Sequence, residues 1–85
     1  MDPLASFGRV LRQLRKDAGL TQEQLALEAG IERNYVSLIE RGINQPALRM
    51  IFKLAEALGT SPSEILRHVE AELTMESTLT PKARN

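Results

Sequence analysis

Hydrogen-bonding side chains are grouped in the segment between Gln22 and Arg41. A guanidinium and a carboxamide stand next to each other at Arg33 and Asn34, and a hydroxyl follows at Ser37. Groups of this kind bind planar polar edges and anions through several directed hydrogen bonds. The segment therefore predicts binding chemistry, and the rest of the chain must supply the elements that hold these side chains outward.

The residues that build catalytic centres are scarce. The chain has one histidine and no cysteine, so it offers no thiol nucleophile and no thiolate metal ligand. It also lacks a phosphate-binding glycine loop and the spacing typical of metal ligands. An enzyme is the least supported class of function, and we expect no cofactor and no metal.

The length and composition predict one small domain. Apolar residues make up 42% of the 85 residues and aromatic residues only 4%, so Leu, Ile, Val, Ala and Met must build the core. The absence of cysteine fits a cytoplasmic location. No apolar run approaches the roughly 20 residues that cross a bilayer, and the start Met1-Asp2-Pro3 does not resemble a signal peptide. We expect no contact with a membrane.

The net charge is zero, with 11 basic and 11 acidic residues. A neutral chain counts against nucleic-acid binding, because cationic surface drives phosphate binding. A neutral total can still conceal a basic face, so charge alone does not decide the function.

Apolar residues at helical spacing predict a first helix that ends before Gly19. These residues are Leu4, Phe7, Val10, Leu11, Leu14 and Ala18. A second helix opens at Thr21, where Gln24 completes a capping-box pattern, and it runs to Ala29 before Gly30.

Three further helices are predicted. The third covers about residues 32–41, and 43–46 form a loop whose Pro46 suits the first turn of the fourth helix. We expect the fourth helix to end before Gly59 and to bury Leu48, Ile51, Phe52, Ala55 and Leu58. The fifth begins with Ser61-Pro62-Ser63-Glu64 and carries Ile65, Leu66, Val69 and Leu73. The expected fold is all-α, with a domain over 1–73 and a frayed or disordered tail over 74–85.

The second and third helices have the residues that a steep crossing needs. Ala26 is small enough for two backbones to approach, and Gly30 suits a left-handed residue in a tight turn. Ile31 can fill the turn, while Val36 and Ile39 pack inward. The other residues of the third helix are then free to face outward.

In order, these positions resemble the Cro/phage-repressor type of helix-turn-helix domain. The resemblance rests on Thr-Gln-Glu-Gln-Leu-Ala-x-x-Ala-Gly-Ile, then Tyr-Val-Ser-x-Ile-Glu-Arg-Gly, then Pro-Ala-Leu and Leu-Ala-Glu-Ala-Leu-Gly. It covers about residues 7–70 and implies a five-helix, lambda-repressor-like domain. In this family the second helix of the motif lies in the major groove of a double-stranded DNA operator, and the first crosses the backbone.

The resemblance assigns roles to individual residues. The base-contacting positions are Arg33, Asn34, Ser37 and Leu38. Their chemistry suits this, since Arg pairs with guanine, Asn with adenine, and an apolar group touches the thymine methyl. The phosphate-contacting positions are Thr21, Gln22, Tyr35, Arg41, Asn44 and Gln45. Two of these have alternatives: Thr21 caps its helix in any case, and Tyr35 can instead cover the core.

In phage repressors an Arg and a Glu at the places of Arg15 and Glu40 form an internal ion pair. The resemblance therefore implies a structural role for both residues, without contact to DNA. Such a pair fixes the orientation of two helices more than it adds stability, because desolvation offsets the attraction.

One recognition helix reads only a few base pairs, so we expect a homodimer on two half-sites. A stripe on the fifth helix, with a contribution from the fourth, is the candidate interface: Met50, Leu66, Val69 and Leu73. The alternative is that these residues close the core of the monomer.

The sequence thus predicts a DNA-binding transcription regulator without a small-molecule effector. Both Cro-like repressors and the controller proteins of restriction–modification systems are small regulators of this kind. The compact length, the Arg that opens the third helix and the closing Ser-x-Ile-Glu-Arg-Gly resemble the controllers more. The alternative is a protein-interaction module, such as an antitoxin or adaptor subunit, that has lost DNA affinity.

Overall fold

A computed structural model describes residues 2–78, without the side chains of 76–78. The order of elements is α1 (Pro3–Asp17), α2 (Gln22–Ala29), α3 (Arg33–Glu40), α4 (Leu48–Leu58) and α5 (Pro62–Thr78). The described residues contain no strand, and the expected all-α, five-helix fold is confirmed. None of these helices is long and apolar enough to cross a membrane.

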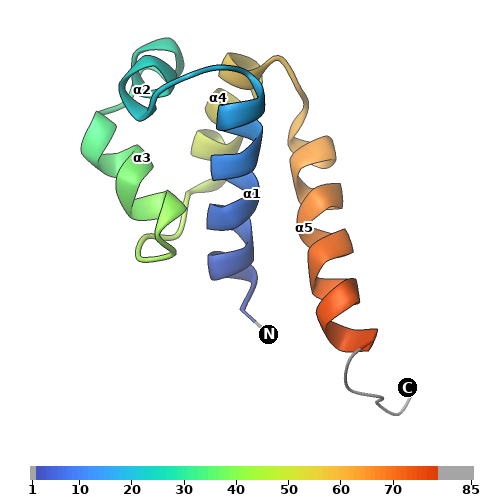
Figure 1. Cartoon of the computed structure of the whole chain (residues 1–85). Coiled ribbons are helices and arrows are strands. Elements are labelled where there is room, and N and C mark those ends of the chain that lie inside the picture. The colour runs from blue at the N-terminus through green and yellow to red at the C-terminus, as the bar shows by residue number, and fades with distance from the viewer. Residues whose placement is uncertain (1, 79–85) are drawn as a thin grey trace.

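The first helix, α1, lies in the middle of the molecule, with α3 on one side and α5 running antiparallel on the other (Figure 1). Asp2 caps its start by accepting the N–H of Leu4 at 3.1 Å. At its other end Gly19 has a φ of 74°, and the N–H of Leu20 donates to the carbonyl of Arg15 at 3.1 Å. The predicted glycine stop is therefore confirmed.

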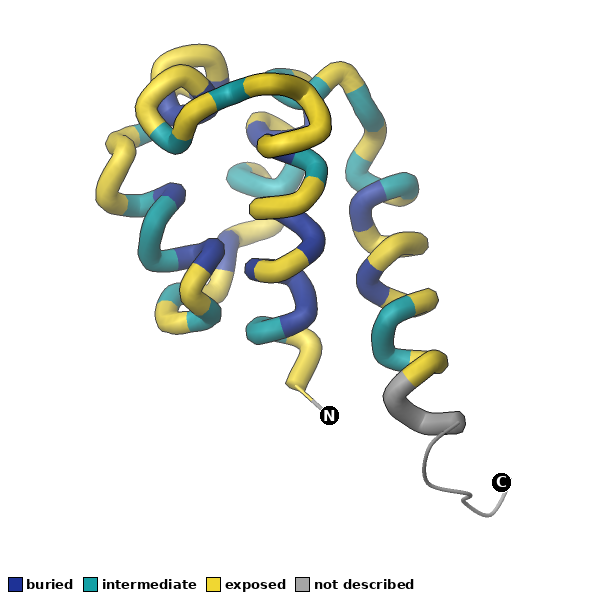
Figure 2. Tube along the Cα trace, viewed as in Figure 1, coloured by how far each residue is buried: buried dark blue, intermediate teal, exposed yellow. Residues whose placement is uncertain are grey.

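Every helix contributes at least one fully buried aliphatic side chain to a single core. These side chains are Leu11, Leu25, Val36, Ile39, Leu54 and Ile65. The buried parts of the chain lie where the helices face one another (Figure 2). Replacing one such leucine with Ala typically lowers the free energy of unfolding by about 2–5 kcal/mol. This core therefore fixes the relative orientation of α2 and α3.

The predicted burial along α4 is partly wrong. Leu48 and Phe52 are 70% and 56% exposed, whereas Leu54 is fully buried. The apolar arc of α4 is wider than the core can cover, so one edge of it stays outside. Pro46 is also not in the helix: it is buried just before the N-cap Ala47.

The last helix is longer than the sequence indicated. We predicted that the pattern decays from residue 74, but α5 continues to Thr78. At its start the hydroxyl of Ser61 accepts the N–H of Glu64 at 3.1 Å. The predicted tail over 79–85 lies outside the described residues.

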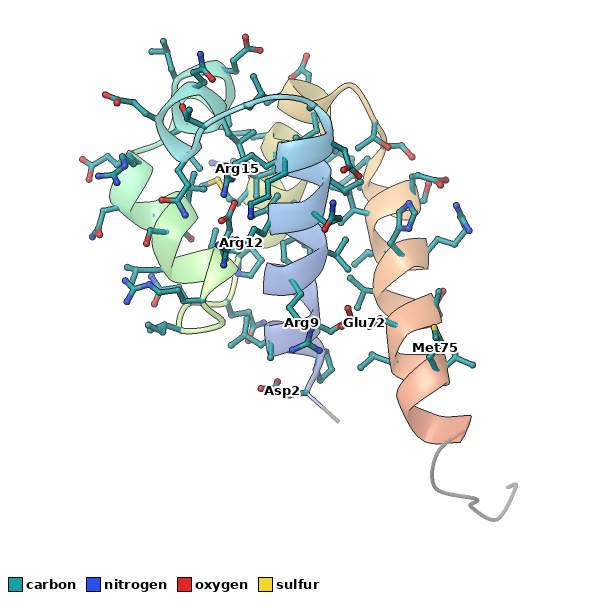
Figure 3. The ribbon with its side chains drawn as sticks, in the orientation of Figure 1. Asp2, Arg9, Arg12, Arg15, Glu72 and Met75 are labelled. Carbon is teal, nitrogen blue, oxygen red and sulfur yellow. The ribbon has the colours of Figure 1, made fainter. Side chains whose placement is uncertain are left out.

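A polar cluster that the sequence did not reveal fastens α5 to α1. The hydroxyl of the fully buried Ser6 donates to Glu72 Oε1 at 2.5 Å, and Arg9 donates to the same oxygen through Nη2 at 2.7 Å. Arg9 and Glu72 face each other between the two helices (Figure 3). The bonds from Arg9, and then the bond from Ser6, lower the pKa of Glu72.

Candidate nucleic-acid interface

The crossing of α2 and α3 has the geometry that the sequence predicted. Gly30 ends α2 in the left-handed conformation, at φ 72° and ψ 34°. The N–H of Ile31 then returns to the carbonyl of Ala26 at 2.9 Å, and Ala26 is buried where α2 meets the core. This turn sets the direction in which α3 leaves α2.

The two faces of α3 differ in character. Val36 and Ile39 are fully buried, so the opposite side of the helix is left to solvent. Arg33 and Asn34 are exposed in the first turn, and the half-buried residues of the helix are Tyr35, Ser37 and Leu38. The four predicted base-contacting side chains thus come from one short helix.

A shallow hollow of about 260 Å³ lies on this part of α3, lined by Glu32, Asn34, Tyr35 and Leu38. Tyr35 packs against the core, so its ring partly fulfils the covering role that the sequence left open. Tyr35 therefore contacts the core and also borders the exposed hollow.

The start of α2 combines a capping box with backbone N–H groups that have no helical partner. Thr21 and Gln24 form the predicted capping box: the Thr21 hydroxyl accepts the N–H of Gln24 at 3.0 Å, and Gln24 Oε1 accepts the N–H of Thr21 at 2.8 Å. The N–H groups of Gln22 and Glu23 have no earlier helical carbonyl to pair with. They and the helix dipole favour negative charge at this end.

After α3 the chain passes through a tightly turned loop. Gly42 has a φ of 75°, and the carbonyl of Leu38 accepts the N–H groups of Ile43 and Asn44 at 2.9 and 3.3 Å. Three predicted phosphate-contacting residues lie in this region. Arg41 and Gln45 are exposed, and Asn44 is half-buried.

The predicted ion pair between α1 and α3 is present. Arg15 Nε and Nη2 donate to the two carboxylate oxygens of Glu40 at 2.6 and 3.1 Å, and the two side chains are only 10% and 2% exposed. Arg15 also donates to the carbonyl of Leu20 at 2.8 Å. The pair therefore ties α1, the turn before α2, and the end of α3 together.

A third partner of this pair was not predicted. The Nε2 group of Gln22 donates to Glu40 Oε1 at 3.0 Å. The two residues are 18 positions apart in different helices, and no local pattern connects them. The predicted phosphate contact and the predicted structural pair are thus joined in one network.

The residues predicted for a dimer interface do not form one exposed stripe. Val69 is buried in the core of the monomer, and Met50 and Leu73 pack partly against it. Leu66 alone is exposed, at 42%. Leu48 and Phe52, the two α4 residues that were expected to be buried, are also exposed.

Comparison with known proteins matches residues 11–65 to the helix-turn-helix family. An uncharacterized HTH-type transcriptional regulator of Sinorhizobium fredii is 36% identical over 66 residues, covering 78% of this chain and 86% of that protein. The control protein C.BamHI of Bacillus amyloliquefaciens is 41% identical over 61 residues, covering 71% of this chain and 75% of its own length.

The same motif and helix order recur in solved structures. The restriction-modification controller protein C.AhdI from Aeromonas hydrophila superposes with a TM-score of 0.72 at 47% identity, covering 73% of this chain and 94% of that one. The family match over residues 11–65 includes the whole α2–α3 crossing. The chain therefore belongs to the helix-turn-helix family, and within it to the Cro/phage-repressor type that its sequence resembles.

Proposed function

We propose that this protein is a sequence-specific transcription regulator that binds palindromic DNA operators as a homodimer. The observation that carries the proposal is the exposed face of α3, where Arg33 and Asn34 stand in the first turn on a helix anchored by Val36 and Ile39. An α-helix fits the major groove of B-DNA, and the N-terminal residues of a recognition helix meet the base edges.

In this proposal α3 reads the bases. Arg33 pairs with guanine and Asn34 with adenine, each through two hydrogen bonds. Ser37 contacts a base one turn further along, and Leu38 touches a thymine methyl. The hollow beside Asn34 and Leu38 gives a base edge room to approach.

The residues at both ends of the motif hold the DNA backbone. At the start of α2, the N–H groups and the side chains of Thr21 and Gln22 meet one phosphate. Beyond α3, Arg41, Asn44 and Gln45 meet another, and the hydroxyl of Tyr35 reaches the backbone from the edge of α3. Contacts of this kind fix the register of the protein on the duplex without reading its sequence.

The dimer forms through the exposed apolar surface at the edge of α4 and α5, which we call the α4–α5 patch: Leu48, Phe52 and Leu66. Phe52 shares a hollow with Pro62 at the start of α5, and Leu66 shares another, of about 560 Å³, with Ile51 of α4. Leu48 lines neither hollow, but it lies one helical turn before Ile51 and Phe52 on α4. Burying the patch against a second copy removes apolar surface from water, and a dimer is what a pair of half-sites about 34 Å apart requires.

We further propose that the regulator controls its own operon as the controller of a restriction–modification system. Support comes from C.BamHI and C.AhdI, since this chain spans most of the length of each. A Cro-like repressor is the alternative. Occupancy of the operators follows the concentration of the protein in the cytoplasm, with no small-molecule effector.

Selection of bound sequences from a random duplex pool tests the proposal. The expected result is a palindrome whose half-sites lie about one helical turn apart. The Arg33→Ala/Asn34→Ala variant serves as the control and should recover no such palindrome. If the folded wild-type protein recovers no sequence, the regulator proposal is wrong and a protein-interaction module becomes the better reading.

A further inference from the structure

The side chain of Gln22 is held by a buried carboxylate. Gln22 is the first residue of α2, and its Nε2 donates to Glu40 Oε1 at 3.0 Å. An ionised carboxylate can only accept hydrogen bonds, so the amide must turn an N–H toward Glu40. This bond restricts the rotation of a side chain that would otherwise have several rotamers.

The charge of Glu40 is neutralised at the same place. Both of its oxygens accept from Arg15, and its side chain is 2% exposed. Without the guanidinium, a buried and unpaired carboxylate would stand beside the start of α2 and repel an approaching phosphate. Because Arg15 neutralises Glu40, Glu40 can hold the Gln22 amide without repelling an anion that binds at the start of α2.

The amide group of Gln22 has two N–H bonds, and Glu40 uses one of them. The second remains available to an acceptor outside the protein. It lies at the start of α2, where the backbone N–H groups of Gln22 and Glu23 have no earlier helical carbonyl to pair with and favour an anion. Arg15 also donates to the carbonyl of Leu20 and so fixes the turn before α2. The same network of Arg15 and Glu40 therefore positions both the Gln22 amide and the backbone at the start of α2.

We propose that Glu40 is a positioning residue for DNA binding. Together with Arg15, it holds the Gln22 amide in advance in the orientation that donates to a DNA phosphate. Preorganisation of this kind raises affinity because less side-chain freedom is lost on binding. The inference deepens the proposed function and depends on it.

A double-mutant cycle tests the coupling. Gln22→Ala is made in the wild-type protein and in the Arg15→Met/Glu40→Met background, which replaces the ion pair with apolar side chains of similar size. Binding to a labelled duplex of mixed sequence is measured at low salt. We expect Gln22→Ala to weaken wild-type binding roughly tenfold and to have little effect in the Met background. An equal loss in both backgrounds would overturn the inference.

A second measurement needs no variant. Nitrogen relaxation of side-chain amides in the free wild-type protein compares Gln22 with Gln45, an exposed glutamine in the loop after α3. We expect the order parameter of the Gln22 amide to approach the roughly 0.85 of rigid backbone, and that of Gln45 to fall below about 0.6. Equal mobility of the two amides would also overturn the inference.

The two proposals fail in different ways. A wild-type protein that binds no duplex at low salt contradicts DNA binding itself, and the positioning role falls with it. A wild-type protein that binds well, but whose Gln22 acts independently of the ion pair, leaves the proposed function in place and removes only the role of Glu40.

Discussion

Gly8 of α1 lies directly against the backbone of Glu40 at the end of α3. A Cβ on Gly8 would stand 2.6 Å from the carbonyl oxygen of Glu40 and equally close to that of Ile39. Neither oxygen can move aside, because both belong to the backbone of a packed helix. The absence of a side chain at this one position allows α1 and α3 to approach closely enough for Arg15 to reach Glu40.

The first prediction concerns this close approach. Alanine is favoured over glycine by about 1 kcal/mol in a helix, yet Gly8→Ala should destabilise the protein by roughly 1–3 kcal/mol, because overpacking outweighs that preference. Urea unfolding measures the difference, with Gln13→Ala on the exposed face of α1 as the control, expected within about 0.5 kcal/mol of the wild type. A Gly8→Ala protein as stable as the wild type would show that the helices move apart at no cost.

The second prediction concerns the carboxylate of Glu72. Arg9 and Ser6 lower its pKa below the ordinary value of 4.5, so its ionised form is favoured in the folded state. The resulting stability is fully present above about pH 4.5 and is lost as the pH falls through the lowered pKa. Glu72→Gln should therefore be less stable than the wild type at pH 7, and the gap should close in acid.

Unfolding by urea at a series of pH values checks this expectation. Glu70→Gln, an exposed position on the same helix, is the matched control and should show no such convergence. The difference in the free energy of unfolding between Glu72→Gln and the wild type could instead stay constant from neutral pH to below pH 4. That result would mean that the charge of Glu72 does not fasten α5 to α1.

Much of the fold could be predicted because its signals are local. The capping box of Thr21 and Gln24 and the left-handed Gly30 both depend on residues within one turn of each other. Helical spacing likewise placed Val36 and Ile39 inside. The resemblance to the family then supplied the one long-range contact that was predicted, Arg15 with Glu40.

What could not be predicted depends on how whole helices pack. The pattern of α4 contains more apolar residues than one face can bury, and only the position of its neighbours decides that Leu54 lies inside and Phe52 outside. The bonds from Ser6 to Glu72 and from Gln22 to Glu40 join residues 66 and 18 positions apart. Neither bond has a signature in the order of residues along the chain.

The third prediction separates base reading from phosphate binding. Arg33→Ala should weaken binding to the selected operator by about 1–3 kcal/mol and relax the preference at one base pair, whereas Gln22→Ala should weaken all sequences alike. Titration of the operator and of its single-base variants measures both effects. Arg67→Ala is the charge-matched control, because Arg67 is exposed on α5, across α1 from α3 (Figure 1). Equal losses on every sequence for Arg33→Ala would identify Arg33 as a phosphate ligand.

The fourth prediction concerns the α4–α5 patch. Leu48→Glu places a charge in the proposed interface, where burial without a partner is costly, and it should raise the dissociation constant of the dimer at least roughly tenfold. The fold itself should tolerate the change, because Leu48 is 70% exposed and an acidic residue suits the first position of a helix.

Leu27→Glu provides the matched control for this change. Leu27 is a second exposed leucine, at 81%, but it lies on α2 outside the patch, so its replacement should leave the dimer intact. Sedimentation equilibrium of the three proteins gives the dissociation constants directly. If Leu48→Glu dimerises as tightly as the wild type, the second copy binds elsewhere. If Leu27→Glu is the variant that dissociates, the interface lies on α2, which would bring it beside the DNA backbone and contradict the docking of α2 as well.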